Sequence, residues 1–139
     1  MFYATLTEDD TCLLCVGSGT VKASEIFEAK ATLDLNRLKA VLFAIVDFQE
    51  TQELDLTMNE IRDLARVEET LSQSAPNTCV AIVAPKDPHF GLARMWEIFV
   101  ETSGWKTGVF RTFKEACCWA RHNCPDHPLV NSATHRLQA

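Results

Sequence analysis

The feature that most constrains this chain is a pair of short, almost unbroken apolar runs. Residues 41–48 (VLFAIVDF) hold seven apolar residues in eight, and residues 79–84 (CVAIVA) are apolar throughout. Runs without polar alternation are typical of strands buried on both faces, as in the centre of a parallel sheet. The two runs therefore predict the middle strands of an α/β fold.

Helix start signals follow both runs. Thr57 and Glu60 have the spacing of a capping box, which predicts a helix over residues 57–74. Asp87 predicts a second N-cap, and Pro88 suits the first helical position because its missing N–H needs no partner there. Parallel strands require such crossover helices, so these signals agree with the apolar runs.

The remaining elements are shorter, with a glycine-rich turn at residues 17–19 expected before the first helix. The predicted strands cover residues 2–6, 12–17, 41–48, 79–84 and 106–111, and the predicted helices start near Ser24, Thr57, Asp87 and Thr112. This order predicts a single α/β sandwich, with a mixed sheet whose parallel central strands are covered by helices. We expect one domain at residues 1–121. Prolines and scattered polar residues then predict a loosely ordered tail at residues 122–139.

Composition narrows the classes of partner. The 139 residues are 47% hydrophobic and 23% charged, as in an ordinary globular protein, and a net charge of -6 disfavours nucleic acid. No apolar run approaches the roughly 20 residues of a membrane-spanning helix, and the start MFYATLTEDD lacks the segments of a signal peptide. The sequence therefore predicts a cytoplasmic protein with reduced thiols.

Six cysteines raise the question of a metal site. Cys12 and Cys15 fall in a predicted strand, where an offset of three places their side chains on opposite faces. A denser cluster near the C-terminus consists of Cys117, Cys118, His122, Cys124 and His127. This cluster lacks a second C-x-x-C, and Cys117 lies on an apolar helix stripe, so core thiols are the better interpretation. We expect no metal ion and no other cofactor.

Two segments resemble a known family. In residues 81–96 (AIVAPKDPHFGLARMW), an apolar strand and a proline-containing turn lead into a helix that opens with Phe-Gly-Leu-Ala-Arg-Met. Residues 109–119 (VFRTFKEACCW) combine a valine-phenylalanine-arginine strand with an acidic-aromatic helix. These patterns resemble the STAS superfamily, the fold of anti-sigma factor antagonists, and most closely its SpoIIAA-like branch of small bacterial proteins.

The resemblance implies a non-enzymatic regulatory or protein-interaction module, because STAS proteins generally engage partner proteins. Some members carry a phosphoacceptor in an Asp-Ser-Ser-Gly motif before the helix that follows the central strand. In the corresponding stretch here, Asp55 matches, Thr57 supplies a hydroxyl where the acceptor serine would lie, and the glycine is absent. The branch is also linked to the lipid-binding Sec14 class. This link implies, as the alternative, a protein that binds a small molecule such as a lipid or a nucleotide.

Candidate surface residues gather where parallel strands are expected to end, because loops and helix N-termini converge there. The predicted partner or ligand surface consists of Asp47, Asp55, Thr57, Lys86, Asp87, His89 and Arg94. Thr57 is the candidate phosphoacceptor, but a purely structural helix cap explains it equally well. His89 could serve acid-base chemistry, yet a solvent-exposed histidine in the first helical turn is the simpler interpretation.

Aromatic side chains also allow two interpretations. Trp96, Phe99 and Phe113 have helical spacing and suit either plain core or the wall of a ligand cavity. Trp105 could anchor a protein partner or a second copy of the chain. The sequence thus leaves open a protein-interaction module and a small-ligand carrier. It favours an enzyme least, because its titratable groups are scattered.

Overall fold

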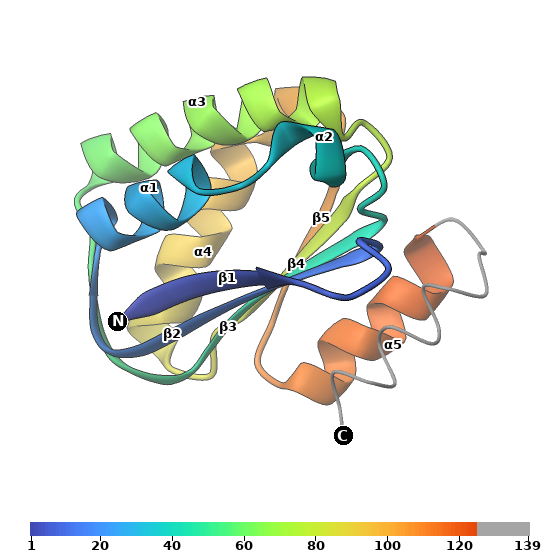
Figure 1. Cartoon of the computed structure of the whole chain (residues 1–139). Helices are drawn as coiled ribbons and strands as arrows, with labels where there is room; N and C mark the ends of the chain where they lie inside the picture. The colour runs from blue at the N-terminus through green and yellow to red at the C-terminus, as the bar shows by residue number, and fades with distance from the viewer. Residues whose placement is uncertain (125–139) are drawn as a thin grey trace.

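The computed structural model describes residues 1–124, which form a five-stranded sheet in the order β1-β2-β3-β4-β5 (Figure 1). The strands are β1 (Phe2–Leu6), β2 (Cys12–Lys22), β3 (Phe43–Asp55), β4 (Cys79–Val83) and β5 (Lys106–Phe110). The helices are α1 (Ala23–Ala31), α2 (Leu35–Leu38), α3 (Met58–Ser74), α4 (Asp87–Phe99) and α5 (Phe113–Asn123), with a 3-10 turn, η1, at Glu101–Ser103. β1 is antiparallel to β2 and the other neighbours are parallel, which confirms the predicted mixed sheet.

The strand order explains where the helices lie. The crossovers from β2 to β3, β3 to β4 and β4 to β5 each move one position along the sheet in the same direction. Such crossovers are almost always right-handed, which forces the helices within them onto one face. Figure 1 shows α1, α2, α3 and α4 together on that face and α5, which follows the last strand, on the other.

Each face of the sheet buries its own apolar core. The α5 face, named after its covering helix, is built from Cys12, Phe43, Ile45, Cys79, Ala81, Val83, Ala116, Ala120 and Cys124. The four-helix face is larger and joins the other sheet side chains to the inner sides of the remaining helices. Alternate residues of β3 point to the two cores, Phe43 and Ile45 to one and Ala44 to the other. The central run is thus buried on both faces, as predicted.

β2 continues further than the sequence indicates. The prediction of a turn at residues 17–19 is wrong, because these residues remain in β2 and its register shifts against β3 occur around them. Gly17 is required by close packing, since a Cβ there would lie 2.8 Å from Thr51 Oγ1 and 3.0 Å from Phe48 Cδ1. Gly19 has a φ of 62°, a conformation that glycine adopts without steric strain.

β3 is extended in the same way. The sequence predicts a strand that ends at residue 48, but β3 runs on to Asp55, which pairs with Lys22 of β2. The two strands therefore form a long parallel ribbon that projects beyond the shorter β4 and β5. Along this ribbon the backbone N–H and C=O groups of the second half of β3 bond to β2, whereas in a loop they would bond to water.

The helix starts follow local cap chemistry. Thr57 and Thr112 are N-caps as predicted, and each side chain accepts a hydrogen bond from the backbone N–H of the glutamate three residues later. The prediction of a cap at Ser24 is wrong, because β2 runs directly into α1. The N-cap there is Lys22, whose N–H donates to the Glu25 carboxylate at 3.1 Å.

The last described element, α5, ends at Asn123 with Cys124 as its C-cap. The tail predicted at residues 122–139 therefore lies, from residue 125 on, outside the described residues. Within residues 1–124, no helix is both long and apolar enough to cross a membrane.

Candidate ligand cavity

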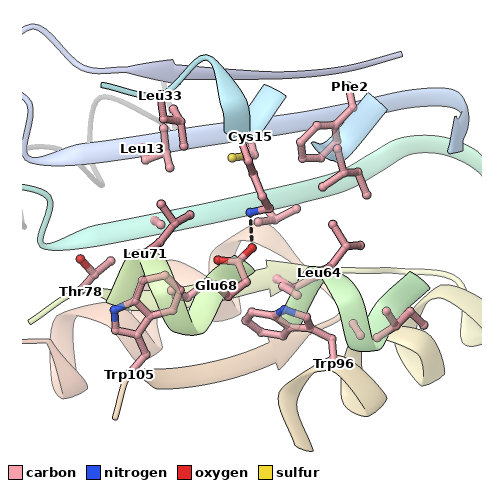
Figure 2. A pocket seen from close by; sticks show the side chains of 18 of the residues that line it. Phe2, Leu13, Cys15, Leu33, Leu64, Glu68, Leu71, Thr78, Trp96 and Trp105 are labelled. Atoms are coloured by element: carbon pink, nitrogen blue, oxygen red, sulfur yellow. Dashed lines mark ion pairs between the residues drawn. The ribbon is translucent and has the colours of Figure 1, made fainter. Parts of the chain in front are cut away.

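An apolar cavity of about 100 Å³ lies on the four-helix face, between the sheet and helices α1, α3 and α4 (Figure 2). The large apolar side chains labelled around it are Phe2, Leu13, Leu33, Leu64, Leu71, Trp96 and Trp105. A single water needs roughly 10–15 Å³, and an apolar cavity of roughly 150 Å³ binds benzene. The cavity is therefore large enough for a small organic group.

One ion pair interrupts the apolar lining. Lys30 of α1 and Glu68 of α3 form a salt bridge in the cavity wall. Figure 2 draws this salt bridge as a dashed line that ends at Glu68. Their side chains are only 14% and 9% exposed, so both charges are largely withdrawn from water. Cys15 of β2 also lines the cavity and lies close to the pair. Charges at this depth are tolerated only because each compensates the other.

The surroundings set the charge states of the lysine and the thiol. Burial by itself lowers the pKa of Lys30, but the Glu68 carboxylate and Cys15 more than offset it, so the lysine pKa lies above its ordinary value. Burial raises the pKa of the Cys15 thiol from 9.0 to about 11. At neutral pH the wall therefore carries an ammonium, a carboxylate and an uncharged thiol, with no net charge.

The periodicity of two helices directs this pair inward. Glu68 continues the buried stripe of α3 that contains Ile61 and Leu64, and Lys30 follows Ile26 of α1 at a spacing of four. The sequence prediction assigns neither charged residue to a site. The available signal is a charged side chain at an apolar position of a helical stripe, which indicates a buried partner on another element.

The aromatic predictions divide between the two faces. Trp96 lines the cavity, whereas Phe99 packs against the four-helix core and Phe113 against the core of the α5 face. Trp105, predicted as an anchor for a partner, also lines the cavity, and its Nε1 donates to the Ala75 carbonyl at 2.8 Å. Two tryptophans thus contribute to the cavity wall.

The acidic residues of the predicted surface do not converge. Asp47 and Asp55 lie eight positions apart along β3, which separates them by roughly 26 Å. The Asp47 carboxylate accepts hydrogen bonds from the backbone N–H and the side-chain amide of Gln49, at 2.9 Å and 3.0 Å. Thr57 is exposed and forms a reciprocal capping box with Glu60, at 3.2 Å and 2.9 Å. Asp47 and Thr57 thus serve local backbone structure.

The segment before α4 is held by neighbouring elements. Lys86 is the N-cap of α4, so the prediction of Asp87 as the cap is wrong by one residue. The Lys86 ammonium donates to the Gln52 carbonyl at 3.3 Å. Asp87 forms an ion pair with Arg111, which also lies 4.1 Å over the Phe90 ring. These contacts fix the segment to β3 and to the end of β5.

His89 is not the solvent-exposed residue that the sequence predicts, because its side chain is only 4% exposed. His89 lies four residues before Ala93 and seven before Trp96, so the three residues share one buried stripe of α4. Its Nδ1 has no hydrogen-bond partner among the described residues. Burial, and then the nearby Lys86 charge, lower the pKa of His89. The ring is outside the cavity lining.

The last predicted surface residue, Arg94, lies on the exposed side of α4. Its guanidinium donates to Glu97 in the same helix at 2.7 Å. This pair is local to one helix turn. The seven predicted surface residues therefore do not form one site, and the cavity is the site that the fold provides.

The cysteines behave as buried thiols more than as ligands. Cys117 is fully buried, as expected for a core thiol. His122 Nδ1 lies 2.8 Å from the backbone carbonyl of the exposed Cys118. Cys12 and Cys15 belong to opposite faces, as predicted. Residues 1–124 contain no group of three ligands suited to a metal ion, and His127 lies outside them.

A scan of the sequence against protein-family models finds no match, and a search of curated proteins finds none that matches. The fold and the cavity are therefore the observations from which a function is proposed.

Proposed function

We propose that this protein is a non-enzymatic binding module whose cavity takes up a small, mainly apolar molecule. The observation that carries the proposal is the cavity itself, which has a volume of about 100 Å³ and is lined almost wholly by apolar side chains. Protein interiors rarely contain spaces much larger than a water molecule. An apolar cavity leaves the side chains that line it without partner atoms on one side. A bound apolar molecule would supply those contacts.

Two further features support a binding role. His89, the candidate for acid-base chemistry, is buried outside the cavity lining, and the predicted surface residues do not converge on one cleft. The Sec14-like resemblance implies a small-molecule ligand, the class of function that an internal apolar cavity suits. The cavity lies between the sheet and α1, α3 and α4, so a ligand would contact elements from both halves of the chain.

The proposal is tested by titrating the full chain with isobutane, an uncharged and wholly apolar probe that is smaller than benzene. We expect amide chemical shifts measured by NMR to change around the cavity, at Leu13, Ala44 and Leu64, and to stay constant on the α5 face. Thermal unfolding should shift to higher temperature with probe concentration, because a ligand that binds only the folded state stabilises it.

A cavity-filling substitution provides the control. Ala44→Leu projects extra side-chain atoms from β3 into the cavity and should abolish probe binding while leaving the fold intact. Ala31→Leu makes the same chemical change at an exposed position of α1 and should bind the probe like the wild type. Constant wild-type shifts at probe saturation, or equal binding by Ala44→Leu, would contradict the proposal.

We also infer a second candidate function, a regulatory protein-interaction module of the STAS type. The observation that favours it is the position of Thr57, an exposed hydroxyl at the N-cap of α3, next to Met58, which is 52% exposed. A phosphoryl group there would lie at the positive end of the helix and place negative charge beside an apolar contact surface.

Intact-mass measurement on protein purified from its own cells tests this second candidate. We expect a species heavier by one phosphoryl group that disappears in Thr57→Ala and persists in Thr112→Ala, the matched cap of α5. Unmodified protein in every growth phase, or phosphate retained by Thr57→Ala, would exclude Thr57 as the switch.

A further inference from the structure

The Lys30–Glu68 pair has more hydrogen-bond donors and acceptors than its salt bridge uses. An ammonium has three N–H donors and a carboxylate has two acceptor oxygens, but within residues 1–124 the pair joins Lys30 Nζ to Glu68 Oε1. Both residues line the cavity. Donors and an acceptor oxygen therefore remain for a molecule that enters it.

We propose that the Lys30–Glu68 pair recognises the polar group of the ligand, and that this ligand is a small neutral molecule with a hydroxyl group on an apolar body. The proposal rests on the proposed function of the cavity and narrows it to one chemical class. It follows from the place of the pair: Figure 2 shows Glu68 between Leu71 and Trp105 on one side and Leu64 and Trp96 on the other.

The balance of charge argues for a neutral ligand. The pair has no net charge, and the Cys15 thiol beside it stays protonated at neutral pH because burial raises its pKa to about 11. An anionic ligand attracted by Lys30 would be repelled by Glu68, and a cationic ligand attracted by Glu68 would be repelled by Lys30. Neither would regain the hydration energy that it loses in an apolar cavity.

The mixture of donors and acceptors argues for a hydroxyl. A hydroxyl group accepts from an ammonium N–H and donates to a carboxylate oxygen at the same time. Hydrogen bonds to charged groups are stronger than those between neutral groups. An ether or a ketone would only accept, and would leave the remaining carboxylate oxygen without a donor.

Four size-matched probes, each with four non-hydrogen atoms, separate these possibilities: isopropanol, isobutane, acetate and isopropylammonium. Affinities are measured on the full chain from the fluorescence of Trp96 and Trp105 in a Trp119→Phe background, because Trp119 packs on the α5 face. We expect isopropanol to bind about tenfold more tightly than isobutane, the effect of one hydrogen bond to a charged group. The two ions should bind more weakly than isobutane.

The double variant Lys30→Met/Glu68→Leu tests whether the pair is responsible. Replacing a buried ion pair with apolar side chains of similar size usually preserves folding. The variant should bind isobutane at least as well as the wild type and should lose the tenfold preference for isopropanol. Circular dichroism of the variant confirms that it is folded before binding is compared.

The outcomes distinguish the two proposals. If isobutane fails to bind the wild type, the proposed function fails. If isobutane binds as tightly as isopropanol, or if the double variant keeps the preference for isopropanol, the cavity is a binding site but the ion pair does not recognise a hydroxyl. Tighter binding of the carboxylate than of the alcohol would show that Lys30 leaves Glu68 for an anion, which also overturns the inference.

Discussion

The α5 face and the four-helix face of the sheet cover their strands in different ways. One helix closes the α5 face, and it approaches the sheet with the small, fully buried Ala116 and Ala120. Several helices cover the other face, yet that face contains the cavity. A single helix can settle onto the sheet until its small side chains touch. Helices that also contact one another, such as α1 and α3, are held partly by each other.

The contrast extends to polar groups. On the four-helix face, α1 and α3 meet through the Lys30–Glu68 pair, whereas the α5 face is built from apolar side chains and thiols. The pair fixes where α1 and α3 lie relative to one another, because two buried charges must remain in contact. The difference teaches that the face with more covering helices is the one that contains both the cavity and the buried charges, which suits it to binding.

The largest expected effect is the loss of one partner of the buried pair. Lys30→Met leaves the Glu68 carboxylate in an apolar wall without its cation, which should reduce the free energy of unfolding by about 3–5 kcal/mol at neutral pH. Denaturant unfolding measures this loss. Lys30→Met/Glu68→Leu should recover most of it. A loss below about 1 kcal/mol for the single variant would show that the pair is effectively hydrated.

A matched pair of core substitutions compares the packing of the two faces directly. Ala81 is fully buried on the α5 face, and Ala44 borders the cavity. Ala81→Leu should destabilise the protein by about 3 kcal/mol, because a closely packed site must move to admit three more carbon atoms. Ala44→Leu should change stability by less than about 1 kcal/mol, because its new atoms enter existing space. Equal losses in thermal unfolding would contradict the comparison.

Alkaline pH should weaken the four-helix face through Cys15. Its thiol has a pKa of about 11 in the folded protein against an ordinary 9.0, so the unfolded chain loses the proton first and stability falls as pH rises through this window. By pH 11 the loss should be about 2 kcal/mol. The raised pKa of Lys30 adds a further loss, which begins near its ordinary pKa of 10.5 and grows at higher pH.

The control for this pH dependence is Cys15→Ala, compared with the wild type by denaturant unfolding at each pH. Its stability should fall less steeply between pH 9 and pH 11, whatever its stability at neutral pH. Parallel curves for the two proteins would assign the alkaline loss to other groups.

The smallest expected effect concerns the helix caps, for which the two faces should not differ. Thr57→Ala removes the cap of α3 and Thr112→Ala that of α5, and each should cost about 1 kcal/mol. Thr57→Ser and Thr112→Ser retain the hydroxyl and should restore most of the loss in thermal unfolding. A much larger loss for Thr57→Ala than for Thr112→Ala would indicate that Thr57 does more than cap its helix.

The sequence predicts the elements whose signals are local. Thr57 and Thr112 mark the starts of their helices. Each side-chain oxygen accepts a hydrogen bond from the backbone N–H three residues later, which is a short-range interaction. The extension of β2 and β3 is not predictable in this way. Gly17 and Gly19 are typical of turns, and only the presence of Thr51 and Phe48 on the adjacent strand shows why glycine lies within β2.

Local sequence patterns predict only part of the candidate site. Trp96 is among the residues that the sequence offers for a cavity wall, and it lines the cavity, but no pattern assigns a role to Lys30 or Glu68. The prediction of a solvent-exposed His89 overlooks its spacing. His89 lies four residues before Ala93 and seven before Trp96, which places it on the buried stripe of α4 wherever the helix is taken to begin.

By itself the sequence determined a mixed sheet with buried central strands, because apolar runs and helix caps act over a few residues and crossover handedness limits how they connect. Only the tertiary structure decided that a cavity remains on one face and that Lys30 and Glu68 meet in its wall. These features depend on how closely α1 and α3 approach each other and the sheet. Such distances arise from the packing of residues far apart in the chain, which no local pattern specifies.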